Sequence, residues 1–213
     1  MGIDIVDPRI EDYLRHLVGG EHEVADAMEE AAGGFPIVGR VVGVTLEVLA
    51  LSIGARRVLE LGSGFGYSAY WFARAVGPGG EVHTTDTDPK MPARAAEYLG
   101  RAGLAGRVRA HVGEAVEVID ELDGEFDVIF NDIDKEGYPQ AWRKARERIR
   151  VGGLYLCDNV LWAGRVAEGV PDDGPEGITE AVLEHNHAVA EDDRYRSTVV
   201  PTRDGVMVAL RID

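Results

Sequence analysis

The sequence predicts an α/β protein: a doubly wound, mostly parallel seven-stranded sheet that ends in an antiparallel hairpin. From residue 57 onward, five short apolar runs alternate with helix-like segments and glycine turns. This alternation is typical of a parallel sheet with helices on both faces. The tail from residue 196 to residue 212 then has the pattern of two strands joined by a turn at Asp204 and Gly205.

The elements follow in order along the chain. The five parallel strands are expected at 57–61, 81–85, 108–112, 126–130 and 154–157. Helices are expected between and after them at 67–76, 91–102, 115–121, 140–149 and 178–190. Upstream, Asp7 caps a helix whose first residue is Pro8, with Ile10, Tyr13, Leu14 and Leu17 at helical spacing.

Two more helices are expected before the first strand, at 24–32 and 38–52. The second is apolar nearly all round, which predicts that it is buried. We expect a single domain over residues 1–213, with residues 1–35 as an N-terminal helical segment and residues 36–213 as the core that contains the motifs described below. A chain of 213 residues is long enough to bury one sizeable core.

Composition narrows the function classes. The net charge of −16 disfavours a nucleic-acid partner, because such proteins normally present a basic surface. Three lysines stand against 38 acidic residues, which suggests an acid-coated surface adapted to high salt, as in halophilic proteins. No run approaches 18 apolar residues and the N-terminus lacks a signal pattern, so we expect a cytoplasmic protein without a membrane span. The single cysteine, Cys157, excludes a disulfide framework.

The segment VLELGSGFGYS, residues 58–68, places a glycine loop where the first strand meets its helix. Gly62, Gly64 and Gly66 allow a tight turn and a close approach to a ligand. The dinucleotide fingerprint requires a small residue where this chain has Tyr67, which weakens an NAD or nucleotide-sugar interpretation. Glu60, two positions before the loop, suits a cationic ligand better than a pyrophosphate.

Asp86 follows Gly66 by 20 residues, at the end of the second strand. A carboxylate there can accept both hydroxyls of a ribose, one on each oxygen. Taken alone, the loop and the acid also fit an ordinary strand–turn–helix connection with a capping acid. Taken together, they favour a nucleoside site.

Oxygen-bearing side chains follow two further strands. Asp132 lies just past the fourth strand, and Asp158 and Asn159 lie just past the fifth. If those strands are neighbours, the three side chains converge on one point at the carboxyl edge of the sheet. Two carboxylates and an amide suit a hard cation, Mg²⁺ first and Mn²⁺ or Ca²⁺ as alternatives. Each acid alone is also consistent with a helix cap or a turn.

The motifs LELGSGFGYS and TTDTDP together resemble the cofactor site of class I S-adenosylmethionine-dependent methyltransferases. FNDIDKEGY and CDNVLWAGRV resemble the metal-dependent O-methyltransferases of the catechol and caffeoyl-CoA type. The resemblance runs from about residue 36 to the end of the chain. It implies a methyl transfer from S-adenosylmethionine to a small hydroxylated acceptor, and a homodimer.

The resemblance also implies roles for individual residues. The metal ligands are Asp132, Asp158 and Asn159, and the catalytic base is Lys135. The cofactor-binding positions are Val38, Glu60, Gly62, Gly64, Gly66, Ser68, Asp86, Ala115 and Asp132. Trp162 is expected to wall the substrate pocket.

Lys135 has a physical reason to act as a base, because a nearby divalent ion disfavours its charged form. The same ion stabilises an ionised acceptor hydroxyl, so a proton can pass to the lysine. The alternative role is a salt bridge to Asp134 or Glu136. Two other functions stay open: a tRNA hydroxyuridine O-methyltransferase of the same fold, and a nucleoside-binding module without catalysis.

Overall fold

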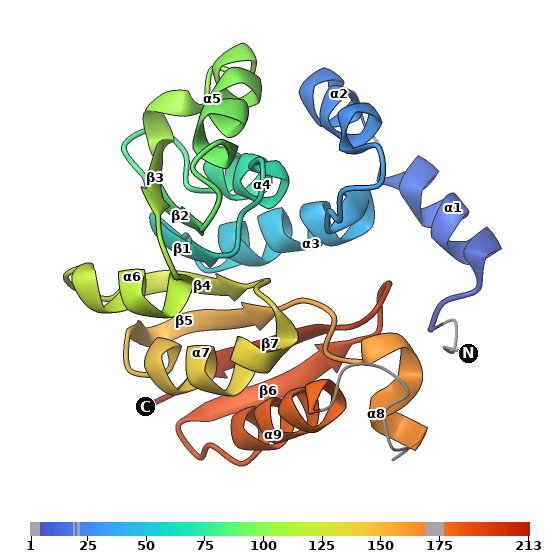
Figure 1. Cartoon of the computed structure of the whole chain (residues 1–213), viewed down its shortest axis with the longest axis vertical. Helices are drawn as coiled ribbons and strands as arrows, with labels where there is room; N and C mark the ends of the chain where they lie inside the picture. The colour runs from blue at the N-terminus through green and yellow to red at the C-terminus, as the bar shows by residue number, and fades with distance from the viewer. Residues whose placement is uncertain (1–4, 19, 21, 169–176) are drawn as a thin grey trace.

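The computed structural model describes residues 5–18, 20, 22–168 and 177–213. Its strands form one seven-stranded sheet in the order β3-β2-β1-β4-β5-β7-β6 (Figure 1). Neighbouring strands from β3 to β5 are parallel, and β7 runs antiparallel to both β5 and β6. The strands are β1 Arg57–Leu61, β2 Glu81–Asp86, β3 Val108–Val112, β4 Phe126–Asn131, β5 Ile149–Cys157, β6 Tyr195–Val200 and β7 Val206–Arg211. The predicted fold class is confirmed.

Helices cover both faces of this sheet (Figure 1). Residues of α2, α3, α4 and α5 share one core cluster with the side chains on one face of the sheet. Residues of α6, α7 and α9 share a second cluster with the other face. The helices are α1 Pro8–Leu17, α2 Glu23–Ala32, α3 Gly39–Ser52, α4 Tyr67–Ala75, α5 Met91–Arg101, α6 Ala115–Glu121, α7 Tyr138–Ala145, α8 Arg165–Glu168 and α9 Ile178–Ala190.

Strands β1 and β4 are buried on both faces, which explains why they are continuous apolar runs in the sequence. Val58 and Val128 belong to one core cluster, whereas Leu59 and Ile129 belong to the other, and all four are fully buried. The acidic and polar residues that follow these strands therefore stand at the edge of the core. This arrangement places the candidate site at the carboxyl end of the sheet.

Two sequence predictions about elements are wrong in detail. The helix expected at 140–149 ends at Ala145, and Ile149 instead begins β5 opposite Phe126. The register shifts between Phe126 and Val128, and a Cβ at Gly153 would lie 2.8 Å from the Asp127 carbonyl oxygen. The strand expected at 154–157 therefore starts at Ile149. Gly153 lies inside it and permits the close approach to β4.

The helix α3 is not buried all round. It packs Val42, Leu46 and Ala50 into the core, but more than half of the Val48 and Leu51 side-chain surface is exposed. None of the helices in the described part of the chain is long and apolar enough to cross a membrane.

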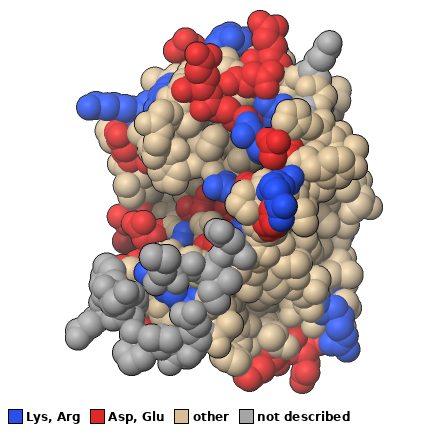
Figure 2. All heavy atoms as spheres, turned by 90° about the vertical axis from the view of Figure 1, so that its right-hand side faces the viewer, with Lys and Arg blue, Asp and Glu red and all other residues tan. Residues whose placement is uncertain are grey.

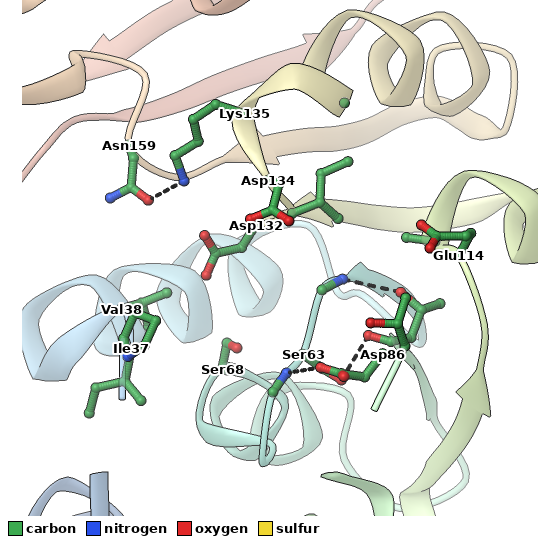
Figure 3. Close-up of a pocket in the computed structure, with 18 of the residues that line it drawn as sticks. Ile37, Val38, Ser63, Ser68, Asp86, Glu114, Asp132, Asp134, Lys135 and Asn159 are labelled. Atoms are coloured by element: carbon green, nitrogen blue, oxygen red, sulfur yellow. Dashed lines mark hydrogen bonds between the residues drawn. The ribbon is translucent and has the colours of Figure 1, made fainter. Parts of the chain in front are cut away.

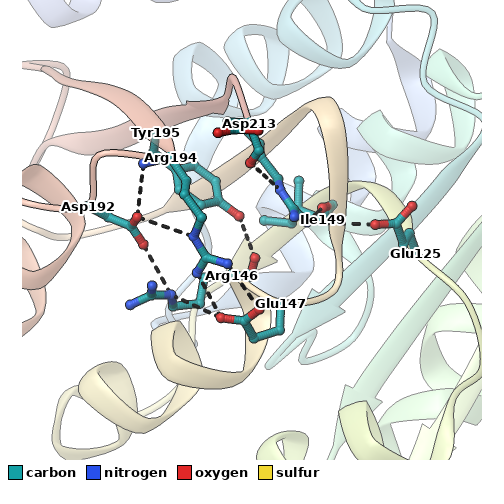
Figure 4. Close-up of polar contacts among 9 residues, drawn as sticks. Glu125, Arg146, Glu147, Ile149, Asp192, Arg194, Tyr195 and Asp213 are labelled. Carbon is teal, nitrogen blue, oxygen red and sulfur yellow. Dashed lines mark hydrogen bonds and ion pairs between the residues drawn. The ribbon is translucent and has the colours of Figure 1, made fainter.

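The start of β6 is fastened to the end of α7 by charged side chains (Figure 4). Arg194 forms an ion pair with Glu147 at 2.7 Å, and Arg146 forms one with Asp192 at 3.1 Å. The Tyr195 hydroxyl donates to the Arg146 carbonyl oxygen at 2.7 Å. These contacts hold the antiparallel hairpin against the parallel part of the sheet.

Candidate functional site

A cavity of about 500 Å³ opens at the carboxyl ends of the parallel strands. On this face of the molecule, acidic and basic side chains lie around a hollow (Figure 2). One wall of the cavity is the loop between β1 and α4, and another is the connection between α2 and α3. Nine of the predicted site residues line it: Val38, Gly62, Gly64, Ser68, Asp86, Ala115, Asp132, Lys135 and Asn159 (Figure 3).

The glycine loop is shaped by close contacts, one with backbone and one with an aromatic side chain. Gly62 has φ +81°, and a Cβ there would lie 2.5 Å from the Asp132 carbonyl oxygen. Gly64 has φ +50°, and a Cβ there would lie 2.9 Å from the Phe35 ring. A side chain is therefore excluded at both positions, so that the backbone itself forms the wall of the cavity.

Asp86 connects the loop to β2. Its Oδ2 accepts a hydrogen bond from the Gly64 amide at 2.9 Å, and its Oδ1 accepts one from the Asp88 amide at 2.8 Å. Each carboxylate oxygen has a second lone pair. The side chain is thus fixed in place while both oxygens can still accept a hydroxyl from a ligand.

Glu60 is completely buried in β1 and is not part of the cavity surface. Burial raises the pKa of its carboxyl to about 8, the nearby Asp86 charge adds to the rise, and the Ser68 hydroxyl opposes it. Neither carboxyl oxygen meets a donor with hydrogen-bond geometry in the described structure. This carboxyl therefore lies behind the cavity wall, next to Ser68, and not on the cavity surface.

Across the cavity, β4 and β5 bring Asp132 and Asp158 together, as predicted from adjacent strands. Burial raises the pKa of Asp132 well above its ordinary value, and the Asp158 charge raises it further, against Lys135. Burial also raises the pKa of Asp158 to about 6, although its Oδ1 accepts the Asn159 amide at 2.9 Å. Asp158 is buried and Asp132 is half-buried at the cavity surface. A bound cation would remove the penalty that arises when both carboxyls are charged.

Lys135 reaches this pair from the start of the segment before α7. Its Nζ donates to Asn159 Oδ1 at 2.9 Å, and Asp132 lies between this contact and the Val38 wall (Figure 3). The alternative salt bridges to Asp134 or Glu136 are absent among the described residues. The lysine therefore points into the site instead of along the surface.

The donor set of Asp132, Asp158 and Asn159 contains only hard oxygen atoms. Residues 5–18, 20, 22–168 and 177–213 contain no cluster of three or more histidine, cysteine or acidic side chains able to hold a metal. A site built from two carboxylates and one amide agrees with that finding, because the amide does not count toward such a cluster.

Four predicted residues do not line the cavity: Glu60, Gly66, Asp158 and Trp162. A Cβ at Gly66 would lie 2.8 Å from Ala95 Cβ, so this glycine permits α4 and α5 to pack closely and does not face a ligand. Trp162 packs against the second core cluster, with the Arg165 guanidinium 5.5 Å from its ring centroid. It does not wall the cavity, because the turn after Asn159 directs it toward α9's side of the sheet.

The sequence reasoning missed the wall supplied by the N-terminal helices. Phe35 lies across the glycine loop, with its ring centroid 5.4 Å from that of Phe65. Tyr67 lines the cavity and its hydroxyl donates to Glu29 Oε1 at 2.6 Å, where the Arg40 Nε also donates at 2.8 Å. The one feature of the sequence that pointed to this wall was Tyr67, which stands where a dinucleotide site has a small residue.

The chain was then compared with known proteins. Residues 29–212 match the family model described as O-methyltransferase. A catechol O-methyltransferase of Niastella koreensis is 35% identical over 167 residues, covering 75% of this chain and 76% of that protein. Caffeoyl-CoA O-methyltransferase 1 of Eucalyptus globulus is 32% identical, covering 80% and 72%. The crystal structure of the O-methyltransferase TomG from Streptomyces achromogenes, in complex with SAM, superposes with a TM-score of 0.86 at 29% identity, covering 96% of each chain.

Proposed function

Because the chain belongs to the O-methyltransferase family, we propose that it moves a methyl group from S-adenosylmethionine to a hydroxyl of a small, catechol-like acceptor. The family resemblance of the sequence motifs is confirmed by this membership. The observation that carries the proposal is the position of Lys135. Its Nζ donates a hydrogen bond to Asn159 Oδ1, beside Asp132 and Asp158. The glycine loop lies on the other side of the same cavity.

The cofactor would lie along the glycine loop. Asp86 is fixed so that its two oxygens can accept the ribose hydroxyls. Glu60 is buried next to Ser68 and Asp86, behind the surface that the cofactor would touch. Val38 and Ser68 face the same space from the opposite side (Figure 3). The solved structure of TomG, which is similar over 96% of this chain, contains SAM, and this supports the assignment.

A divalent cation would be held by Asp132, Asp158 and Asn159. When bound, such an ion would make an acceptor hydroxyl more acidic and would orient two adjacent oxygens. Mg²⁺ is the first choice for an all-oxygen donor set, with Mn²⁺ and Ca²⁺ as alternatives.

Lys135 would take the proton of the acceptor hydroxyl on its Nζ. The acceptor oxygen then bonds to the methyl carbon as the carbon–sulfur bond breaks, giving a methyl ether and S-adenosylhomocysteine. The Asn159 amide holds the Lys135 side chain, so its orientation is set before the acceptor enters. Positioning of this kind supplies much of the rate of a transfer between two bound reactants.

The test is methyl transfer to a panel of catechols, flavonoids and bulk tRNA, followed by product mass. We expect transfer to catechol-type acceptors, its loss in EDTA and its recovery with Mg²⁺ or Mn²⁺. Asp158→Ala should behave like the chelated enzyme, and Glu136→Ala is the matched control that removes a nearby acid outside the site. Full activity in EDTA would reject the metal, and transfer to tRNA alone would reject the acceptor class.

A further inference from the structure

The turn between β6 and β7 contains a residue in an unfavourable backbone conformation. Arg203 has φ +48°, a left-handed conformation that favours glycine. Its side chain crosses to the α2–α3 connection, where Nη1 donates to the Ile37 carbonyl oxygen at 2.6 Å. Ile37 and Val38 line the cavity on the cofactor side. An outlier of this kind is a reason to ask what the side chain does.

The same turn also binds the segment that follows Asn159. Asp204 Oδ1 accepts the Ala163 amide at 2.6 Å, and the Asp204 carbonyl oxygen accepts the Leu161 amide at 2.9 Å. The Gly205 carbonyl oxygen accepts the Val160 amide at 3.1 Å. The segment immediately after Asn159 is therefore bonded to the turn along three consecutive contacts.

Arg203 forms no ion pair within the described ranges of the chain. Its Nη1 lies 3.1 Å from the place that a Cβ on Gly39 would occupy, so the side chain packs against the start of α3 as well as binding Ile37.

We propose that Arg203 is a positioning residue, which sets the separation between the Ile37–Val38 wall and the segment that carries Asp158 and Asn159. The inference rests on the proposed methyl transfer. The acceptor oxygen, the methyl carbon and the sulfur must lie in line, and a displacement of about 1 Å costs up to about 10²-fold in rate. A glycine at position 203 would relax the backbone, but it has no side chain to reach the Ile37 carbonyl oxygen. The contact therefore requires the arginine despite the strain.

Three variants separate this role from a purely structural one. Arg203→Gly relieves the backbone but removes the contact, Arg203→Ala removes the contact and keeps the strain, and Arg203→Lys keeps a donor for the Ile37 carbonyl. Arg196→Ala is the matched control, because among the described residues the Arg196 side chain bonds only the carbonyl oxygen of its neighbour Tyr195. For each protein one measures the melting temperature, the affinity for S-adenosylhomocysteine by calorimetry, and kcat and KM with the best acceptor.

We expect Arg203→Gly to melt no lower than the wild type, while kcat falls about 10- to 100-fold and the affinity for S-adenosylhomocysteine falls less than tenfold. Arg203→Ala should lose kcat similarly and melt lower, and Arg203→Lys should recover at least half of the lost kcat. Wild-type kcat in Arg203→Gly would overturn the proposal. So would a loss of kcat that only follows the fraction of unfolded protein.

Failure of the proposed function would give a different result, because the wild type itself would then methylate no acceptor. In that case the inference is decided by the affinity for S-adenosylhomocysteine. A two- to tenfold weakening in Arg203→Gly, restored in Arg203→Lys, would support it, and equal affinity in all four variants would overturn it.

Discussion

At the scale of the residue, Glu60 is an ionisable group that the fold buries completely, with the Ser68 hydroxyl beside it. Its pKa of about 8 means that the folded protein holds a proton which the unfolded chain, with a pKa near 4.5, releases at lower pH. A raised pKa of this kind contributes stability that is full below about pH 4.5. It is lost as the pH rises toward and through about 8.

Glu60→Gln should therefore change the pH dependence of stability. The free energy of unfolding of the wild type without cofactor should fall by roughly 2–5 kcal/mol between pH 5 and pH 8, and that of Glu60→Gln should fall less. Denaturant titrations at several pH values measure this. Ser68→Ala is a useful comparison, because it removes the hydroxyl that opposes the shift and should raise the Glu60 pKa further. Parallel pH profiles for the wild type and Glu60→Gln would contradict the assignment.

A second residue-scale prediction concerns Lys135. Lys135→Ala should bind S-adenosylhomocysteine nearly as well as the wild type, whereas kcat should fall by about 10²- to 10⁴-fold, the usual worth of a general base. Part of that loss should return at higher pH, where the acceptor hydroxyl ionises without help. Calorimetry and initial rates measure the two effects. Lys144→Ala, which removes a lysine bonded to Asp120 outside the cavity, is the control.

At the scale of the element, the glycine loop is the part of the site that tolerates least change. Gly62→Ala would place a methyl group 2.5 Å from the Asp132 carbonyl oxygen at φ +81°, so both the backbone and β4 must shift. We expect a loss of about 2–4 kcal/mol in stability, together with weaker cofactor binding. Gly103→Ala is the matched control, because its φ is +69° but no atom lies within 4 Å of the added methyl group. Equal losses in the two variants would contradict the role assigned to close approach.

Element order was predictable because strands such as β1 and β4 are buried on both faces and are therefore short apolar runs that alternate with helix-like segments. The proximity of Asp132, Asp158 and Asn159 was also predictable, because the carboxyl ends of adjacent parallel strands meet at one edge of the sheet. The end of α7 was not predictable, because the pairing of Ile149 with Phe126 decides it. The contact of Arg203 could not be predicted either, because its partner Ile37 lies 166 residues away along the chain.

At the scale of the whole molecule, the net charge of −16 should make stability depend on salt. Like charges on a compact surface repel one another, and added ions screen them. We expect the melting temperature to rise from dilute buffer to molar KCl, and methyl transfer to be best at the high end of that range. Scanning calorimetry and rates across a salt series measure this. A maximum of both in dilute buffer would reject the idea of a high-salt habitat.

The exposed apolar side chains of α1 should decide whether the protein is a monomer or a dimer. Ile10, Tyr13 and Leu17 are each more than half exposed and lie along one side of the helix. We expect this side to form the contact of a homodimer, because burying large apolar side chains stabilises association. Light scattering at high salt should give twice the chain mass for the wild type and the chain mass for Ile10→Asp. A monomeric wild type would contradict the prediction.

The position of β7 between β5 and β6 also has a consequence for how the chain folds. β6 precedes β7 along the chain, yet in the described sheet it pairs with β7 alone. β6 can therefore join that sheet only together with β7 or after it. The turn that carries Arg203 lies between the two strands, so its bond to Ile37 depends on the same hairpin. Native-state hydrogen exchange should show β6 and β7 opening together, at a lower free energy than β1 and β4.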